Sequence, residues 1–446
     1  MKKISLFAAL LCLFVAGPAH AVTVEEVTGS KSGVKAWLVE DHHLPIVAMR
    51  FAFTGGSEQD PVAKQGLATL TMNALTEGAG PYNADAFQKE LAGRSIALGF
   101  SAERDVLAGG LKCLSVDKAK AFDLLHLALT APRFEAKDIE RLRAQQLSAV
   151  RQQFSEPDWQ ARYALFSHIF AGHPYGERHL GSAATLAAIS RGDIRSFATT
   201  HMARDNVTVA VAGDMTVAEL AAALDKIFAD LPAKAQLAAI PEAVEPRDAT
   251  TILVRRDGTQ SNLLFALPGP KRSDPDWYAA DIANYILGGG GFSSRLMQEI
   301  RDKKGLTYGI DTGLAPADHD GLILGQAAVD NPKVSEVLDV LRETMEKFRD
   351  NGVTPQEVAA AKDYLSGSEA LALTSTDKIA EVLVAMQRDK LGRDYLDRYA
   401  DLIRGVTQAA ITRAIDRWFD PDHMTLVMVG LPQGIAANET HDMVRQ

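Results

Sequence analysis

The second half of this chain repeats the pattern of the first half, and this repeat constrains the fold more than any other feature. Residues 194–213 and 411–430 each read as a helix, a short turn and an apolar strand that ends on glycine. A long stretch rich in alanine, leucine and charged residues precedes each copy, at 136–154 and 354–373. The copies lie about 220 residues apart, far beyond the 20–50 residues of a solenoid repeat, so the pattern predicts two homologous domains.

The strands expected from alternating apolar residues cluster in each half instead of alternating strictly with helices. They lie at 34–40, 46–53, 95–102 and 106–114 in the first half, and at 251–256, 261–267, 306–314 and 322–329 in the second. Such clustering favours antiparallel pairing. The sequence therefore predicts an α+β fold with two homologous domains, each a mostly antiparallel sheet covered by helices.

A linker is predicted at residues 233–247, which contain Pro241 and Pro246 and show no apolar periodicity. This linker separates an N-terminal domain, 22–232, from a C-terminal domain, 248–446.

Residues 1–21 have the three parts of a secretory signal peptide. Lys2 and Lys3 form a charged start, a short apolar run follows, and residues 19–21 read Ala-His-Ala, a cleavage site of small residues. The apolar run is too short to span a bilayer, and no later run is long and apolar enough to do so. We therefore expect an exported chain without a membrane span, most simply a periplasmic one.

Charge and cysteine content narrow the function classes. The formal net charge is −10, and loss of Lys2 and Lys3 with the signal peptide gives −10 − 2 = −12. This acidic balance argues against a nucleic-acid partner, which requires a basic surface. Loss of Cys12 leaves Cys113 alone, so no intrachain disulfide is possible, and we expect Cys113 to be a small buried apolar residue.

Four segments resemble the insulinase/pitrilysin family of zinc peptidases, in its compact bacterial form with two homologous domains. They lie at 66–68, 140–150, 173–176 and 287–308, and the last is the longest. Members of that family carry H-x-x-E-H on a helix that begins Gly-Leu-Ala. The two histidines share one helix face and bind zinc, the glutamate is the general base, and a carboxylate from a later helix completes the protein ligands.

The residues that carry this chemistry are absent here. Thr69 and Asn73 stand at the histidine positions, Met72 stands at the glutamate, and the later acidic pair falls on Ser148 and Ala149. Threonine and asparagine offer only neutral donors, and methionine cannot accept a proton. The sequence therefore predicts no metal and no other cofactor in this chain.

The resemblance also identifies Arg301 and Tyr308 as catalytic candidates. In the family, an arginine and a tyrosine at this spacing face the zinc across a closed chamber and stabilise the tetrahedral intermediate. A guanidinium and a phenol are donors suited to a developing oxyanion. The alternative is that Arg301 forms a salt bridge on its own helix while Tyr308 is a half-buried strand residue. Arg295, one to two turns earlier, is a competing candidate.

The glycine run Gly288, Gly289, Gly290 and Gly291 is predicted to bind substrate. It is similar to a glycine-rich loop on the non-catalytic subunit of processing peptidases. A phosphate-binding loop is excluded because no Gly-Lys-Ser/Thr follows. A plain turn before a helix is the alternative.

Together these features suggest a subunit that needs a partner. The resemblance implies the non-zinc-binding subunit of a periplasmic heteromeric metallopeptidase, inactive alone and an endopeptidase with a homologous partner that carries zinc on H-x-x-E-H. Peptides would be the substrates. The alternative is a non-catalytic peptide-binding or scaffold protein of the same fold.

Overall fold

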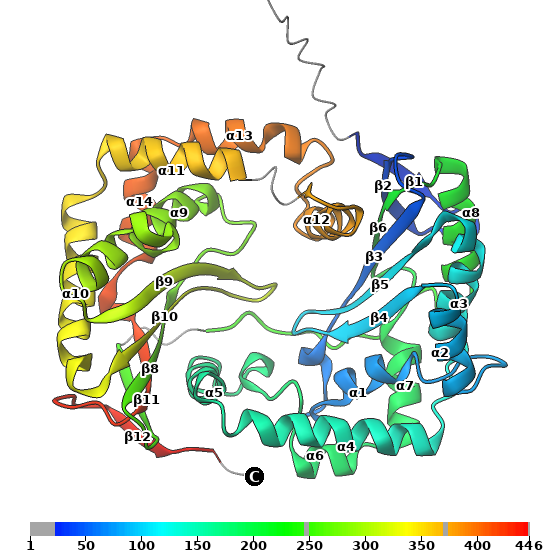
Figure 1. Cartoon of the computed structure of the whole chain (residues 1–446), viewed down its shortest axis with the longest axis horizontal. Coiled ribbons are helices and arrows are strands. Elements are labelled where there is room, and N and C mark those ends of the chain that lie inside the picture. The colour runs from blue at the N-terminus through cyan, green and yellow to red at the C-terminus, as the bar shows by residue number, and fades with distance from the viewer. Residues whose placement is uncertain (1–22, 245–248, 369–372, 445–446) are drawn as a thin grey trace, which may run out of the picture.

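Two sheets lie at opposite sides of the molecule, each with several helices on its outer face (Figure 1). The computed structural model describes residues 23–244, 249–368 and 373–444. The predicted signal peptide, 1–21, and Pro246 of the predicted linker lie outside these ranges. The α+β fold with two mostly antiparallel sheets is confirmed.

The first sheet has the strand order β1-β2-β6-β3-β5-β4. Its strands are β1 (Glu25–Thr28), β2 (Lys35–Glu40), β3 (Ile46–Thr54), β4 (Ala97–Ala102), β5 (Val106–Leu114) and β6 (Val207–Gly213). All neighbours are antiparallel except β2 and β6.

The second sheet has the order β12-β7-β11-β8-β10-β9. Its strands are β7 (Thr250–Arg255), β8 (Gln260–Pro268), β9 (Thr307–Pro316), β10 (Gly321–Asp330), β11 (Thr425–Gly430) and β12 (Glu439–Asp442). The two strand orders are the same when each strand is matched with its equivalent in the other sheet. The equivalent strands are β2 and β7, β6 and β11, β3 and β8, β5 and β10, and β4 and β9. Only the outermost strand differs, because β1 is antiparallel to its neighbour and β12 is parallel to its neighbour.

One side-chain arrangement repeats at equivalent places in both sheets. Phe51 on β3 lies opposite Gly109 on β5, and Phe265 on β8 lies opposite Gly325 on β10. A Cβ atom at Gly109 would lie 2.2 Å from the Phe51 ring, and one at Gly325 would lie 2.1 Å from the Phe265 ring. Each phenylalanine therefore packs across a glycine of the neighbouring strand, which extends the sequence repeat to the packing of the core.

The helices of each half bury apolar side chains against their own sheet. In the first half they are α1 (Leu67–Ala74), α2 (Ala84–Gly93), α3 (Lys118–Thr130), α4 (Ala136–Gln153), α6 (Ala183–Ala188), α7 (Arg191–His201) and α8 (Val217–Phe228). In the second half they are α9 (Trp277–Asn284), α10 (Val334–Asn351), α11 (Pro355–Ser368), α13 (Tyr395–Gly405) and α14 (Gln408–Trp418).

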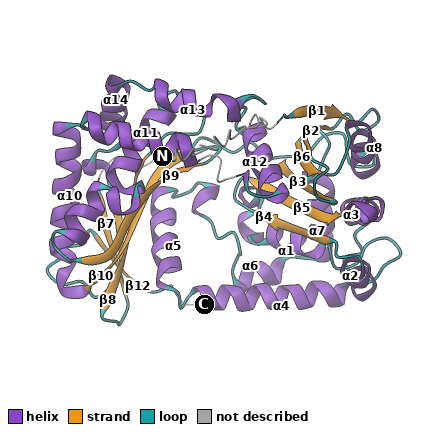
Figure 2. Ribbon diagram, turned by 45° about the horizontal axis from the view of Figure 1, so that its top comes forward, coloured by secondary structure: helices purple, strands orange, loops and turns teal. Residues whose placement is uncertain are grey.

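Two helices cross between the halves. Helix α5 (Pro157–Ile169) lies beside the second sheet and α12 (Thr376–Arg388) lies beside the first, as both views show (Figures 1 and 2). Leu165 of α5 packs with Val427 of the second sheet, and Leu383 of α12 packs with Trp37 of the first. The boundaries at 232 and 248 separate the two sets of strands, but these helices tie the halves together.

The β4–β5 and β9–β10 hairpins also meet at their tips. Asp105 accepts hydrogen bonds from the Tyr175 hydroxyl (2.5 Å) and from the backbone N–H of Asp318 (3.2 Å). The Tyr175 oxygen accepts one from the N–H of His319 (3.1 Å). The Arg104 guanidinium packs 4.8 Å from the Tyr175 ring centre, and burial lowers its pKa. These contacts connect the first sheet to the second.

Candidate functional site

Helix α1 keeps the start of a metal-binding helix. Gly66 precedes it with a φ of +90°, a conformation that favours glycine, and the Asp60 carboxylate accepts from the N–H groups of Gly66 and Ala68, both at 2.8 Å. A Cβ atom at position 66 would lie 2.6 Å from the carbonyl oxygen of Leu180. Backbone geometry therefore explains why the Gly66-Leu67-Ala68 start is present.

The side chains at the degenerate metal positions do not form a metal site. The Thr69 hydroxyl donates to the carbonyl of His179 (3.1 Å), Met72 is 1% exposed in the core, and Asn73 is exposed. On α4, Ser148 and Ala149 are exposed and carry no carboxylate. Within the described ranges, no three His, Cys, Asp or Glu side chains come together as metal ligands. The donors at these positions do not fit zinc.

Neutral hydrogen bonds hold α4 beside the start of α1. The Gln146 amide of α4 donates to the carbonyls of Gly66 (3.1 Å) and Leu180 (3.0 Å), and its side chain is buried. The two helices that would hold zinc ligands in a peptidase are thus packed together by an amide.

Arg301 belongs to a short π-helical segment, Met297–Asp302, of the kind often found at functional sites. Its guanidinium forms an ion pair with Asp302 (2.9 Å) and lies 4.6 Å from the centre of the Phe292 ring. The side chain is 36% exposed. The ion pair with Asp302 of the same segment is the salt bridge that the alternative interpretation expected for Arg301, although the side chain still reaches the surface.

Tyr308 lies near the start of β9, the edge strand of the second sheet, where the pairing with β10 is interrupted by a bulge at Ala327–Val329. The Thr307 hydroxyl donates to the carbonyl of Ala328 (2.7 Å) and holds this irregular backbone. Bulges redirect side chains, and Tyr308 is 89% exposed. Tyr308 is therefore not the half-buried strand residue of the alternative interpretation.

Arg295, the competing candidate, is occupied by the fold. Its guanidinium donates to both carboxylate oxygens of Glu357 (2.7 and 2.8 Å) and to the carbonyl of Gly352 (2.8 Å). The pair with Arg295 holds the pKa of Glu357 at about 2. Arg295 thus ties its segment to α11, which leaves Arg301 as the arginine near the surface.

The glycine run divides into a packed part and an open part. A Cβ atom at Gly288 would lie 2.3 Å from the Thr312 hydroxyl, whereas one at Gly291 would meet nothing within 4 Å. Gly288 is buried, and Gly289 and Gly291 are exposed. Close packing against β9 accounts for Gly288, and the surface part leads to Phe292, which is 67% exposed.

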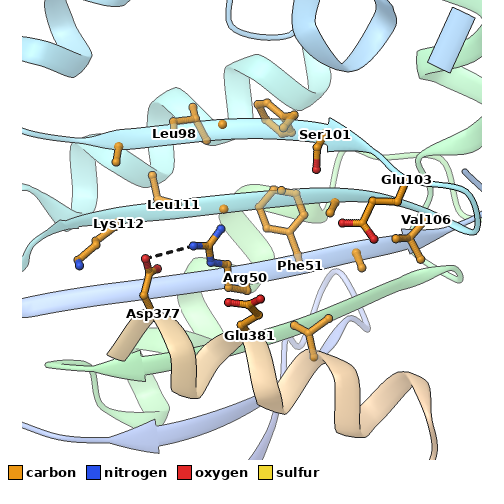
Figure 3. Close-up of a pocket in the computed structure, with 18 of the residues that line it drawn as sticks. Arg50, Phe51, Leu98, Ser101, Glu103, Val106, Leu111, Lys112, Asp377 and Glu381 are labelled. Atoms are coloured by element: carbon orange, nitrogen blue, oxygen red, sulfur yellow. Dashed lines mark ion pairs between the residues drawn. The ribbon is translucent and has the colours of Figure 1, made fainter. Parts of the chain in front are cut away.

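A cavity of about 900 Å³ lies between the inner face of the first sheet and α12 (Figure 3). Arg50 of β3 and Asp377 of α12 form an ion pair there (3.1 Å). Sequence reasoning missed this cavity because it depends on α12, which lies more than 160 residues further along the chain than any strand of the first sheet. No local motif in the sequence signals that contact.

Comparison with known proteins agrees with this scaffold. Residues 35–182 match the family described as insulinase, peptidase family M16, and residues 188–365 match the domain described as the peptidase M16 inactive domain. The chain is 28% identical to a non-peptidase homolog, YmxG, of Helicobacter pylori over 83% of this chain and 85% of that protein. It is 29% identical to an uncharacterised zinc protease of Streptomyces coelicolor, over 59% of each chain.

A solved structure extends the likeness to three dimensions. The crystal structure of a peptidase M16 inactive domain from Pseudomonas fluorescens superimposes with a TM-score of 0.86 and 29% identity, covering 93% of this chain and 99% of that one. The chain belongs to the insulinase family of peptidases. The predicted family is therefore confirmed, and the relative from Helicobacter pylori is described as a non-peptidase homolog.

Proposed function

We propose that this chain is the non-zinc-binding subunit of a heteromeric zinc metallopeptidase and supplies Arg301 and Tyr308 to a homologous partner that carries H-x-x-E-H. The observation that carries the proposal is the contrast within one chain. The α1 positions have no ligand or base, while Arg301 and Tyr308 lie near the surface, with Tyr308 89% exposed on a bulged edge strand.

The chemistry of the two side chains fits a developing oxyanion. A guanidinium has five fixed N–H donors, and Asp302 occupies only part of that set. The Tyr308 hydroxyl is a neutral donor, and the proposal requires it to reach the same oxygen in the complex. Donors placed where charge develops are often the largest electrostatic contribution to catalysis. Zinc in the partner would activate the attacking water.

The surface part of the glycine run supports a role in substrate handling. Gly291 has a φ of +57° and open space where a side chain would be, so a peptide backbone can approach it closely. We assign Gly289, Gly290 and Gly291 to substrate contact, and Gly288 to the packing that positions them.

Export to the periplasm is proposed from the sequence of residues 1–21. In the described ranges, no helix is both long and apolar enough to cross a membrane. The partner is proposed to meet this chain in the compartment that the signal peptide specifies.

The proposal is tested by peptide hydrolysis with this chain alone, with a homologous H-x-x-E-H chain from the same genome alone, and with the mixture. The expected result is activity that requires the mixture and scales with complex formation. A mixture no faster than the zinc-motif chain alone would overturn the proposal and favour the peptide-binding or scaffold alternative.

A further inference from the structure

The guanidinium of Arg301 lies against an aromatic ring on the surface of the second half. Its central carbon is 4.6 Å from the centre of the Phe292 ring, well within the roughly 6 Å over which a cation is attracted to a ring face. Phe292 is 67% exposed and belongs to none of the buried apolar clusters that the described residues form. The contact with Arg301 therefore lies outside the core, where it adds little to the stability of the fold.

The loop that carries this ring and the segment that carries the guanidinium are hydrogen-bonded to each other. The Gln298 side-chain amide donates to the carbonyl of Ser293 (3.1 Å). The Ser294 hydroxyl, on a fully buried residue, donates to the carbonyl of Gly291 (2.8 Å). These bonds hold the backbone on both sides of the ring, so the ring and the helical segment keep a fixed separation.

The π-helical turn sets the place at which Arg301 leaves its segment. The N–H of Lys303 donates to the carbonyl of Gln298 (3.0 Å), five residues earlier, so this turn holds one more residue than an α-helical turn. Met297 and Ile300 are 7% and 0% exposed and anchor the turn in the core. Arg301 directly follows the anchored Ile300, which leaves only its side chain free to move.

The neighbouring Arg295 shows how a different restraint affects the donors of a guanidinium. Arg295 also lies near a phenylalanine, Phe348, at 5.1 Å, but three of its N–H···O bonds go to oxygen atoms of the protein. Within the described ranges, Arg301 donates one such bond, to Asp302. A guanidinium has five N–H donors, and a ring face attracts the cation without accepting a bond from each of them. The Phe292 ring therefore restrains Arg301 and leaves most of its donors available.

We propose that Phe292 is a positioning residue for Arg301, and that it holds the guanidinium where its free donors can meet the oxyanion of the substrate. This inference rests on the proposed function and names a further residue of the same site. Phe292 does not touch the reacting atoms in this proposal. Since the donors of Arg301 act where charge develops, loss of their orientation should lower kcat and leave KM nearly unchanged.

The first test uses this chain alone, labelled with isotopes at arginine, and follows the NMR signal of the Arg301 Nε–H group, which is assigned by its loss in Arg301→Lys. The ring face should shift this signal to low frequency. In Phe292→Leu the shift should disappear and the side chain should become more mobile on the picosecond to nanosecond timescale. Phe292→Tyr keeps a ring face and should preserve both properties. An Arg301 signal that is unchanged in Phe292→Leu would overturn the proposal.

The second test is hydrolysis by the mixture of this chain with a homologous H-x-x-E-H chain. Phe292→Leu should lower kcat about three- to fivefold, the size expected for a cation–ring contact at an exposed site, and should leave KM within about twofold. Phe292→Tyr should restore kcat. In the Arg301→Ala background, Phe292→Leu should have no further effect, because a positioning residue acts only through the group that it positions.

Two kinetic results would also overturn the proposal. A higher KM with unchanged kcat in Phe292→Leu, or the same loss of kcat in the Arg301→Ala background, would mean that Phe292 acts on the substrate and not through Arg301. A mixture that is inactive in every form would reject the proposed function. The NMR signal of Arg301 in this chain alone would still decide whether Phe292 holds the guanidinium, so the two failures can be told apart.

Discussion

The two halves of this protein have the same strand order but present different chemistry. In the first half, Thr69, Met72 and Asn73 leave α1 without a metal ligand or a base. In the second half, Arg301 and Tyr308 lie near the surface, and Arg301 packs on Phe292, which follows the glycine run. The packing that repeats, such as Phe51 on Gly109 and Phe265 on Gly325, belongs to the core. The comparison teaches that a duplicated scaffold can keep its packing while its functional residues change independently.

A second difference concerns open space. Counted from the matched glycines Gly109 and Gly325, the first sheet has the cross-strand pair Gly99 and Gly110 where the second has Asp311 and Gln326. The cavity at the first sheet is three times as large, about 900 Å³ against 300 Å³. The first half therefore has the larger cavity, and the second half has Arg301 and Tyr308 near its surface.

The largest expected effect comes from the packing that the halves share. Phe51→Ala and Phe265→Ala each remove a buried ring that crosses a glycine, and each should lower the free energy of unfolding by about 3–5 kcal/mol. Urea unfolding followed by circular dichroism measures this loss. Phe292→Ala is the control, because an exposed ring should cost less than about 0.5 kcal/mol. A large loss from only one of the two buried substitutions would break the equivalence of the halves.

The next prediction concerns the substitution of Met72 by glutamate, the residue that serves as general base in the family. Met72→Glu places a carboxylate at a position that is 1% exposed in the core, so it should destabilise the protein by about 3 kcal/mol or more. Thr69→His lies at a half-buried position of the same helix and should cost less than about 1 kcal/mol. Thermal unfolding of both variants decides the point. An unchanged melting temperature for Met72→Glu would mean that the core around α1 accepts the peptidase residue.

Substitutions of Arg295 and Arg301 should have different effects, because Arg295 stabilises the fold and Arg301 is proposed to act in catalysis. Arg295→Ala breaks the two-bonded pair with Glu357 and should cost about 2 kcal/mol, whereas Arg301→Ala should stay within about 0.5 kcal/mol of the parent. The Glu357 pKa of about 2 means that the pair stabilises the protein above pH 4.5 and loses this contribution as pH falls towards 2. Urea midpoints at pH 7 and pH 3 measure both effects. Equal losses of unfolding free energy in Arg295→Ala and Arg301→Ala at pH 7 would contradict the structural role of Arg295.

The last effect is a slope per pH unit, and it concerns the junction of the halves. Burial, with a contribution from Asp105, raises the pKa of Glu58 to about 7. The folded state then holds a proton that the unfolded state has lost between pH 4.5 and 7, so stability falls as pH rises through that window, by up to about 1.4 kcal/mol per pH unit. Glu58→Gln should reduce this slope in unfolding series from pH 5 to pH 8. Burial also raises the pKa of Asp60 to about 7. Asp60 therefore contributes a slope of the same sign, and this contribution remains in Glu58→Gln. An unchanged slope in Glu58→Gln would contradict the assignment.

The sequence predicted the strands well because apolar alternation is a local signal. The expected strand 106–114 is β5 as observed, and 136–154 corresponds to α4, Ala136–Gln153. The family and the α+β fold are confirmed. The sequence analysis did not single out α5 or α12, and an amphipathic pattern does not specify which sheet a helix covers. The exchange of these helices between the halves, and the cavity between α12 and the first sheet, therefore required coordinates.

The candidate site was predicted only in part for the same reason. The 287–308 segment located Arg301 and Tyr308 by their spacing, but the bulge that exposes Tyr308 depends on Ala328 of the neighbouring strand. The separation of Arg295 from Arg301 depends on Glu357, more than 60 residues beyond Arg295. The catalytic roles themselves stay predictions.

The most direct test of the central claim is the rate of peptide hydrolysis by the mixture of this chain with a homologous H-x-x-E-H chain, using Arg301→Ala and Lys303→Ala in this chain. Lys303 is an exposed cation two residues away and serves as the matched control. The account predicts that Arg301→Ala lowers kcat/KM about 100-fold or more while Lys303→Ala leaves it within about twofold. A mixed enzyme that is indifferent to Arg301→Ala would contradict the account.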